Sequence, residues 1–236
     1  MSELNILLIT AASVGFFHTL FGPDHYIPFI VMAKARKWSL IKTSWVTFLC
    51  GIGHVLGSIV LGFIGIAVGV AIGNIEAIES FRGDIAGWAL ASFGFVYLIW
   101  GIRKAIKNKP HTHFHDHSDG EVHTHEHMHR DEHTHVHEKD SNTNITPWIL
   151  FTIFVFGPCE ALIPILMYPA ANVGTMGVIA VVAVFALTTI LTMMSIVLTA
   201  SFGLNFLPMG KLDRYSHSLA GAIILISGLS MTVLGL

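Results

Sequence analysis

The run His18-Thr-Leu-Phe-Gly-Pro-Asp24-His25 stands inside an otherwise apolar stretch that covers residues 5–33. Ionisable groups at membrane depth are costly, and they usually face a bundle interior and mark a route for an ion or substrate. Gly-Pro also interrupts a helix, because proline lacks the backbone N–H and collides with the preceding turn. The run therefore predicts a broken membrane helix that carries polar side chains inward.

The composition extends this prediction to the whole chain. Hydrophobic residues make up 53% of the 236 residues and charged residues 12%, which excludes an ordinary soluble domain. Crossing a hydrocarbon core of ~30 Å takes roughly 20 apolar residues in a helix. Six nearly uncharged stretches meet this length: residues 5–33, 43–73, 85–106, 147–170, 175–202 and 217–236. The predicted fold class is an all-α integral membrane protein with six spans.

An internal repeat divides these spans into two halves. The motif Phe-Gly-Pro-Asp-His at 21–25 returns as Phe-Gly-Pro-Cys-Glu at 156–160, an offset of 156 − 21 = 135 residues. Each copy lies in the first span of a three-span half, and because three is odd the second half enters from the opposite face. Inverted repeats with broken helices meeting near the midplane are typical of secondary transporters. The expected parts are a first repeat (1–106), a His-rich loop (107–146) and a second repeat (147–236).

The placement of charge predicts the orientation. Basic residues gather in the links after spans one, three and five, whereas the link between spans two and three carries Glu76, Glu79 and Asp84 with Arg82 as its one basic residue. The positive-inside rule makes the basic links cytoplasmic. We therefore expect a plasma (inner) membrane protein with both termini outside and the His-rich loop in the cytosol. The basic residues are Lys34, Arg36, Lys37, Lys42, Arg103, Lys104, Lys107, Lys109, Lys211 and Arg214.

Seven side chains in the predicted spans form a candidate metal site. Imidazole and carboxylate suit borderline divalent metals such as nickel, cobalt and zinc, and thiolate adds soft character. Counted at 1.5 Å per residue from the ends of their spans, Asp24, His54 and Glu160 lie about 15–20 Å deep, near the middle of a ~30 Å core. The candidate ligands are His18, Asp24, His25, Cys50, His54, Cys159 and Glu160.

Structural roles stay open for several of these residues. The three histidines are also suited to hydrogen bonds between helices. Cys50 lies four residues before His54 and shares its helix face. Cys159 is either a sulfur ligand or a small buried hydrophobe, since free cysteine often packs in that way.

A second histidine cluster lies between the two halves. Residues 111–137 hold eleven of the fifteen histidines of the chain, which is a compositional sign of metal capture. The segment has too few apolar residues for a core, so we expect disorder without metal. Neutral imidazole is the ligand form, so capture should weaken as the histidines protonate. They are His111, His113, His115, His117, His123, His125, His127, His129, His133, His135 and His137.

These motifs together resemble a known group. The His18…Asp24-His25 motif, the Gly-Pro-Cys159-Glu160 motif, the six spans and the histidine loop look like the nickel/cobalt permease and efflux (NicO-type) families. The likeness is strongest to the urease-accessory-type transmembrane proteins of the lysine-exporter superfamily, and it covers essentially the whole chain. Five residues separate His18 from Asp24, where the nickel permease signature has four. The resemblance implies passage of divalent nickel or cobalt, without a prosthetic group and without enzymatic chemistry.

The sequence thus predicts a transporter of Ni²⁺ or Co²⁺, with Zn²⁺ also open, that works through a midplane site. Efflux is preferred to uptake, because a cytosolic histidine tract would gather metal on the side from which it leaves. Two alternatives remain: a thiol–disulfide electron conduit of the cytochrome-biogenesis type, which needs paired thiols within reach, and a membrane metal sensor that does not transport. The expected partners are the lipid bilayer and the metal ion; nucleic acid is not expected, and a homo-oligomer is left open.

Overall fold

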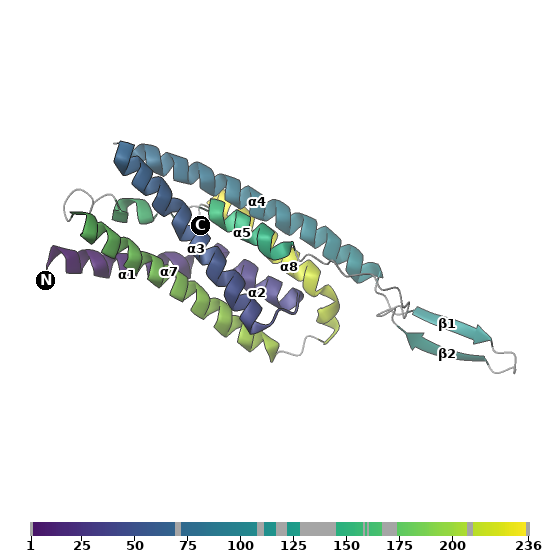
Figure 1. Ribbon diagram of the computed structural model, residues 1–236. Coiled ribbons are helices and arrows are strands. Elements are labelled where there is room, and N and C mark those ends of the chain that lie inside the picture. The colour runs from purple at the N-terminus through teal and green to yellow at the C-terminus, as the bar shows by residue number, and fades with distance from the viewer. Residues whose placement is uncertain are drawn as a thin grey trace.

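Long helices dominate the fold (Figure 1). The structure is a computed structural model that describes residues 2–68, 72–107, 111–116, 122–127, 145–157, 159, 161–166, 174–206 and 210–234. Within these residues five helices are long and apolar enough to cross a membrane. They are α1 (Glu3–Phe21), α3 (Leu40–Val68), α4 (Ile72–Lys107), α7 (Gly174–Asn205) and α8 (Ser216–Leu234), the last preceded by the 3₁₀ helix η2 (Gly210–Tyr215). The described residues thus form the apolar helices expected from the composition, five of them long enough to span a membrane.

The first apolar stretch is broken at its Gly-Pro motif, as predicted. Helix α1 ends at Phe21, and the N–H of Gly22 donates to the His18 carbonyl at 3.0 Å. A short 3₁₀ helix, η1 (Pro23–His25), leads into α2 (Ile27–Ala35). Pro28 stands in the first turn of α2, where the missing N–H has no partner within the helix anyway. Figure 1 shows α2 beyond the end of α1 along the length of the molecule.

The fourth apolar stretch does not form one long helix. Helix α5 (Thr146–Phe156) has 11 residues, too few to cross a bilayer by itself. Its C-cap is Gly157, whose N–H donates to the Phe154 carbonyl at 3.1 Å. Residues 162–166 are helical again. The two breaks correspond, because helices end at 21 and 156 and resume at 27 and 162, each pair separated by 135 residues.

Helix α4 corrects one prediction. The acidic stretch expected as a link between spans two and three lies inside this 36-residue helix, which begins at Ile72. At 1.5 Å per residue α4 is about 54 Å long, longer than a hydrocarbon core of ~30 Å. The sequence interpretation failed because it assigned the charged residues between 76 and 84 to a link, whereas Glu79 is fully buried.

Helices α4 and α8 pack closely over most of their length. Glycines spaced by seven residues allow this approach: a Cβ added at Gly94 would lie 2.3 Å from the Leu225 nitrogen, and one at Gly221 would lie 2.3 Å from the Leu98 nitrogen. Small residues that let backbones approach are characteristic of helix contacts in membranes. The other members of the two glycine rows are Gly87, Gly101 and Gly228.

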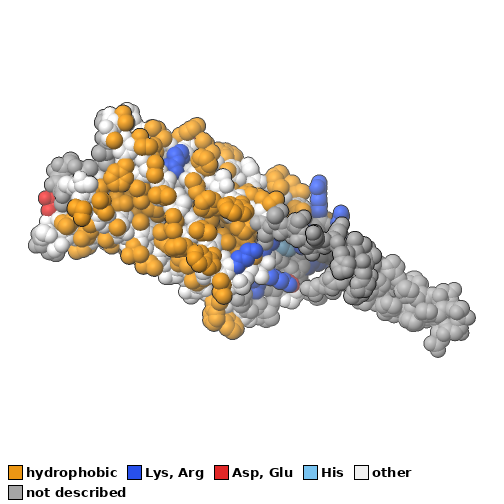
Figure 2. Space-filling model, viewed as in Figure 1, with side chains coloured by type: hydrophobic (Ala, Val, Ile, Leu, Met, Phe, Trp, Pro, Cys, Tyr) orange, Lys and Arg blue, Asp and Glu red, His pale blue; other side chains and the backbone are white. Residues whose placement is uncertain are grey.

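Two hydrophobic clusters fill the interior. One includes Phe154 and Cys50, and the other includes Phe185 and Cys159. Helix α1 packs along α7, and α2 contacts both α7 and α8. Helix α3 contacts α5 and α7. The outer face is largely apolar: Figure 2 shows hydrophobic side chains over most of the visible bundle.

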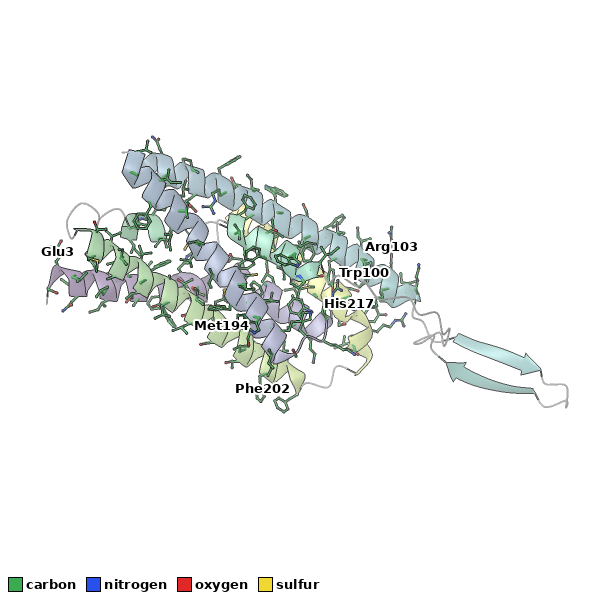
Figure 3. All side chains as sticks on the ribbon, in the orientation of Figure 1. Glu3, Trp100, Arg103, Met194, Phe202 and His217 are labelled. Carbon is green, nitrogen blue, oxygen red and sulfur yellow. The ribbon has the colours of Figure 1, made fainter. Side chains whose placement is uncertain are left out.

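The two ends of the bundle differ. Figure 3 places Glu3 at one end and Trp100, Arg103 and His217 at the other, and blue Lys and Arg side chains gather near this second end in Figure 2. The His-rich segment continues from α4 as an antiparallel hairpin, β1 (His111–Asp116) and β2 (Val122–His127), in which His111 is opposite His127. Its expected disorder in the absence of metal stays a prediction.

Candidate metal centre

Three of the predicted histidines come together inside the bundle. His18 comes from α1, His25 from η1 and His54 from α3, and one ring nitrogen from each lies within 4.8 Å of the others. His25 and His54 are buried, and His18 is partly buried. Among the described residues they form the one group of three or more His, Cys, Asp or Glu with this geometry.

The spacing of the ring nitrogens suits a single ion. The Nε2 atoms of His25 and His54 are 3.2 Å apart, and the His18 ring centroid lies 4.7 Å from that of His25 and 6.3 Å from that of His54. Two nitrogens bound to one tetrahedral metal at 2.0–2.1 Å are about 3.3 Å apart. The pair from His25 and His54 is thus already at ligand spacing, and the His18 nitrogen lies within 4.8 Å of both.

The backbone break at Gly22 sets the hydrogen bonds of the His25 ring. Its Nδ1 lies 3.1 Å from the Gly22 carbonyl and 3.2 Å from Asp24 Oδ1. Both partners are acceptors, so the neutral ring carries its proton on Nδ1 and has its Nε2 lone pair toward the cluster. A carboxylate that orients a ligating histidine in this way also makes it a better donor to metal. Asp24 therefore lies behind His25 rather than among the clustered ligand atoms.

Gly22 is needed for this arrangement. A Cβ at residue 22 would lie 2.5 Å from His25 Nδ1 and 2.9 Å from His25 Cε1, inside contact distance. The glycine thus lets the His25 ring fold back against the end of α1. The Phe-Gly-Pro-Asp-His motif places His25 through this local geometry.

The second motif reaches the same cluster from another direction. Cys159 is fully buried, and its Sγ lies 3.7 Å from His18 Nε2. A Cβ added to Gly157 would lie 3.2 Å from His54 Nδ1 and 3.2 Å from the Phe154 carbonyl oxygen. The rings of His54 and Phe154 are 6.2 Å apart, and those of His18 and Phe185 are 6.4 Å apart. The three histidines thus lie between the two hydrophobic clusters.

Cys50 is the described cysteine that the structure does not bring to the three histidines. Cys50 is buried in the hydrophobic cluster that includes Phe154, and both Cys50 and Cys159 are free thiols. Glu160 lies outside the described residues, as do the loop histidines His117, His129, His133, His135 and His137. The six remaining loop histidines stand in β1 and β2.

The sequence analysis did not predict the buried ion pair of Glu79 and Arg82 beside the centre. Glu79 is 0% exposed, and it pairs with Arg82 on the same helix. Glu79 Oε2 accepts from Ser58 Oγ at 3.0 Å and from the Cys159 N–H at 3.2 Å. The spacing of Glu79 and Arg82, i and i+3 on a helix, was the one sequence signal for this pair.

Arg82 completes the contact with the second motif. Its second nitrogen donates to the Val155 carbonyl at 3.0 Å, near the C-terminal end of α5, where carbonyls lack partners within the helix. Ser58 Oγ also lies 3.1 Å from the Cys159 nitrogen. The ion pair thus holds both sides of the break at Gly157.

Comparison of the chain with protein-family models, with curated proteins and with solved structures found no match. The interpretation of the centre consequently depends on its own geometry and chemistry.

Proposed function

We propose that this protein is a membrane transporter of divalent transition-metal ions, with Ni²⁺ or Co²⁺ as cargo. The observation that carries the proposal is the group formed by His18, His25 and His54, whose ligand nitrogens lie within 4.8 Å of one another inside an apolar bundle. Burying three imidazoles together in a membrane domain is costly unless they serve a ligand. Nitrogen donors favour nickel, cobalt, zinc and copper over magnesium or calcium.

The matched helix breaks support transport over simple binding. If the segment 146–166 crosses the membrane as a broken helix, as residues 3–35 would, the chain has six crossings in two inverted halves. In transporters of this plan the broken helices of both halves meet at the substrate site. The contact between Cys159 Sγ and His18 Nε2, at 3.7 Å, joins one break to the helix that precedes the other.

The distribution of charge supports an orientation. The end of α4 that leads into the hairpin carries Arg103, Lys104 and Lys107. By the positive-inside rule this end faces the cytoplasm, in a plasma (inner) membrane, and the termini face outside. The histidine hairpin would then collect metal in the cytosol, which favours efflux.

Transport would proceed by exchange of water for protein ligands. The ion sheds its hydration shell as the three imidazoles replace it, and Asp24 supplies negative charge through His25. Opening first to one side and then to the other requires the two halves to rock around this point. Imidazoles that bind metal must be unprotonated, so binding is coupled to proton release.

The electron-conduit alternative gains no support from the cysteines. Thiol exchange needs two sulfurs within reach of each other, but Cys50 and Cys159 are free and belong to different hydrophobic clusters. A metal sensor that does not transport shares the same centre, and only flux measurements separate it from a transporter.

The direct test is metal flux into proteoliposomes of known orientation. We expect Ni²⁺ and Co²⁺ flux in the wild type, at least a tenfold loss in His25→Ala and His54→Ala, and retained flux in Trp148→Ala, an exposed control on α5. Metal binding without flux in the wild type would favour a sensor. Equal flux in empty vesicles, or wild-type flux after replacement of all three histidines, would contradict the proposal.

A further inference from the structure

The buried ion pair of α4 has no role in the proposed transport step, yet it contacts the motif that ends beside the metal centre. Buried ion pairs are not in general a source of stability, because desolvation offsets most of the attraction. A pair retained in the apolar part of a membrane protein is more often functional. Its contacts indicate which function.

Both charges are directed at the break that follows α5. Glu79 accepts the Cys159 N–H, and Arg82 donates to the Val155 carbonyl. These are the backbone groups that the helix break leaves without helical partners, and in hydrocarbon each would cost several kcal/mol if unsatisfied. The pair thus holds the backbone at Val155 and at Cys159.

Helix α3 lies close to the pair at Gly57. A Cβ at Gly57 would lie 2.7 Å from Arg82 Nη2 and 2.9 Å from the Val155 oxygen, so α3 approaches the contact without a side chain. Ser58, the next residue, donates to Glu79 Oε2. Helices α3 and α4 therefore both contact the break after α5. Hydrogen bonds to Ser58 and Glu79 restrict the position of the Cys159 backbone.

These contacts determine where the sulfur of Cys159 lies. The Cys159 backbone is held by Glu79 and Ser58 at 3.2 and 3.1 Å, and its Sγ is held 3.7 Å from His18 Nε2. The ligand nitrogens of the three histidines lie within 4.8 Å of one another, and Cys159 Sγ reaches this group through its contact with His18. A metal drawn toward His18 would also meet the sulfur.

We propose that Glu79 and Arg82 are positioning residues that present Cys159 Sγ as a fourth, soft ligand to a metal held by His18, His25 and His54. This inference depends on the proposed metal centre, and it predicts which metal ions that centre prefers. The thiol proton leaves to solvent when the sulfur binds the ion. A site with three imidazoles and one thiolate prefers softer and tetrahedral ions such as Zn²⁺, Cd²⁺ and Co²⁺ more strongly than three imidazoles alone.

The test uses Co²⁺ as the probe, because a cobalt–thiolate bond gives a charge-transfer band in the near ultraviolet that imidazole ligands do not give. The full-length protein is purified with its eleven loop histidines replaced by serine, so that Co²⁺ reports only the buried centre. The wild-type centre is expected to show the thiolate band together with the visible bands of bound cobalt. Cys159→Ser should keep the visible bands and lose the thiolate band.

The decisive variants change the pair without leaving a lone buried charge. In Glu79→Leu/Arg82→Leu the contacts to the Cys159 N–H and the Val155 carbonyl are lost, and we expect the thiolate band to disappear. The preference for Cd²⁺ over Ni²⁺ should also fall about 10–100-fold, the usual effect of losing a supporting contact. Glu79→Gln/Arg82→Gln keeps an acceptor for the Cys159 N–H and should retain the band. Glu76→Gln, an exposed neighbour one turn away on α4, should match the wild type.

Ser58→Ala is a milder second variant in case the apolar pair does not fold, and it should weaken the band in the same direction. The inference is overturned if cobalt binds to the wild type without a thiolate band, or if the apolar pair keeps the band and the metal preference. Loss of the thiolate band in both double variants would also overturn the inference. The charges of Glu79 and Arg82, and not their hydrogen bonds to the backbone, would then be what the thiolate ligand requires. A wild-type centre that binds no Co²⁺ at all would overturn the proposed function together with this inference.

Discussion

His25 shows how a local break in the backbone can set the reactivity of a side chain. The ring lies against the end of α1, with Nδ1 donating to the Gly22 carbonyl and to Asp24. In the neutral ring this tautomer leaves Nε2 without a proton, 3.2 Å from His54 Nε2. In the proposed centre Asp24 would thereby act on the metal through His25, whereas the sequence placed it among the candidate ligands.

Asp24→Ala should weaken Ni²⁺ binding about 10–100-fold, because His25 loses the carboxylate that orients it and strengthens its donor nitrogen. Asp24→Asn keeps an acceptor and should lie between the alanine variant and the wild type. Both affinities can be measured by competition with a chelating dye, on protein whose loop histidines are serine. Wild-type affinity in both variants would show that Asp24 does not support the centre.

Metal affinity should also fall as the pH is lowered through the range in which histidine protonates, around pH 6.5 for the free side chain. Protons compete for the ligand nitrogens, so each imidazole protonated in the free protein costs up to tenfold in affinity per pH unit. Calorimetry in buffers of different ionisation enthalpy counts the protons released. An affinity independent of pH between 5 and 8 would argue against imidazole ligands.

At the scale of elements, the glycine rows of α4 and α8 bring two backbones into contact. Even a methyl group at Gly94 would overlap the Leu225 nitrogen, whereas a Cβ at Gly203 on α7 would meet nothing within 4 Å. Gly94→Ala should therefore destabilise the protein by about 1–3 kcal/mol, as overpacking does elsewhere, and Gly203→Ala should not. Thermal unfolding in detergent measures the difference, and equal midpoints for the two variants would contradict the packing described.

The sequence predicted features that depend on neighbouring residues better than features that depend on residues far apart in the chain. The break at Gly22-Pro23 is local and was predicted, and so was a site containing His18, His25 and His54, which come from two apolar stretches. The burial of Glu79 was not, because it depends on Ser58, Val155 and Cys159 approaching from other parts of the chain. Periodicity within one helix carries no information on such distant partners.

At the scale of the whole molecule, orientation is the prediction most easily tested. A pair of single-cysteine variants, Ser2→Cys and Ser118→Cys, is made with Cys50 and Cys159 replaced by serine. A membrane-impermeant thiol reagent added to intact cells should label residue 2, which is exposed and expected outside. It should label residue 118 in the His-rich loop only after the cells are opened. Labelling of residue 118 in intact cells would reverse the assigned orientation and the argument for efflux.

The segments before and after the His-rich loop both contribute groups to the histidine cluster. The first half supplies all three histidines, and the second half supplies Cys159 and the backbone at Gly157. The ionisable member of the second motif, Glu160, lies outside the described residues. The repeat therefore accounts for the two breaks, but the chemistry on each side of it differs.

The central claim is that His18, His25 and His54 bind one divalent metal ion inside the bundle. X-ray absorption on Ni²⁺-loaded, full-length protein with its loop histidines replaced by serine tests it most directly. We predict one nickel per chain with imidazole scattering, and loss of the bound metal in His25→Ala/His54→Ala. A protein that folds but binds no nickel, or a spectrum unchanged by the double substitution, would contradict the claim.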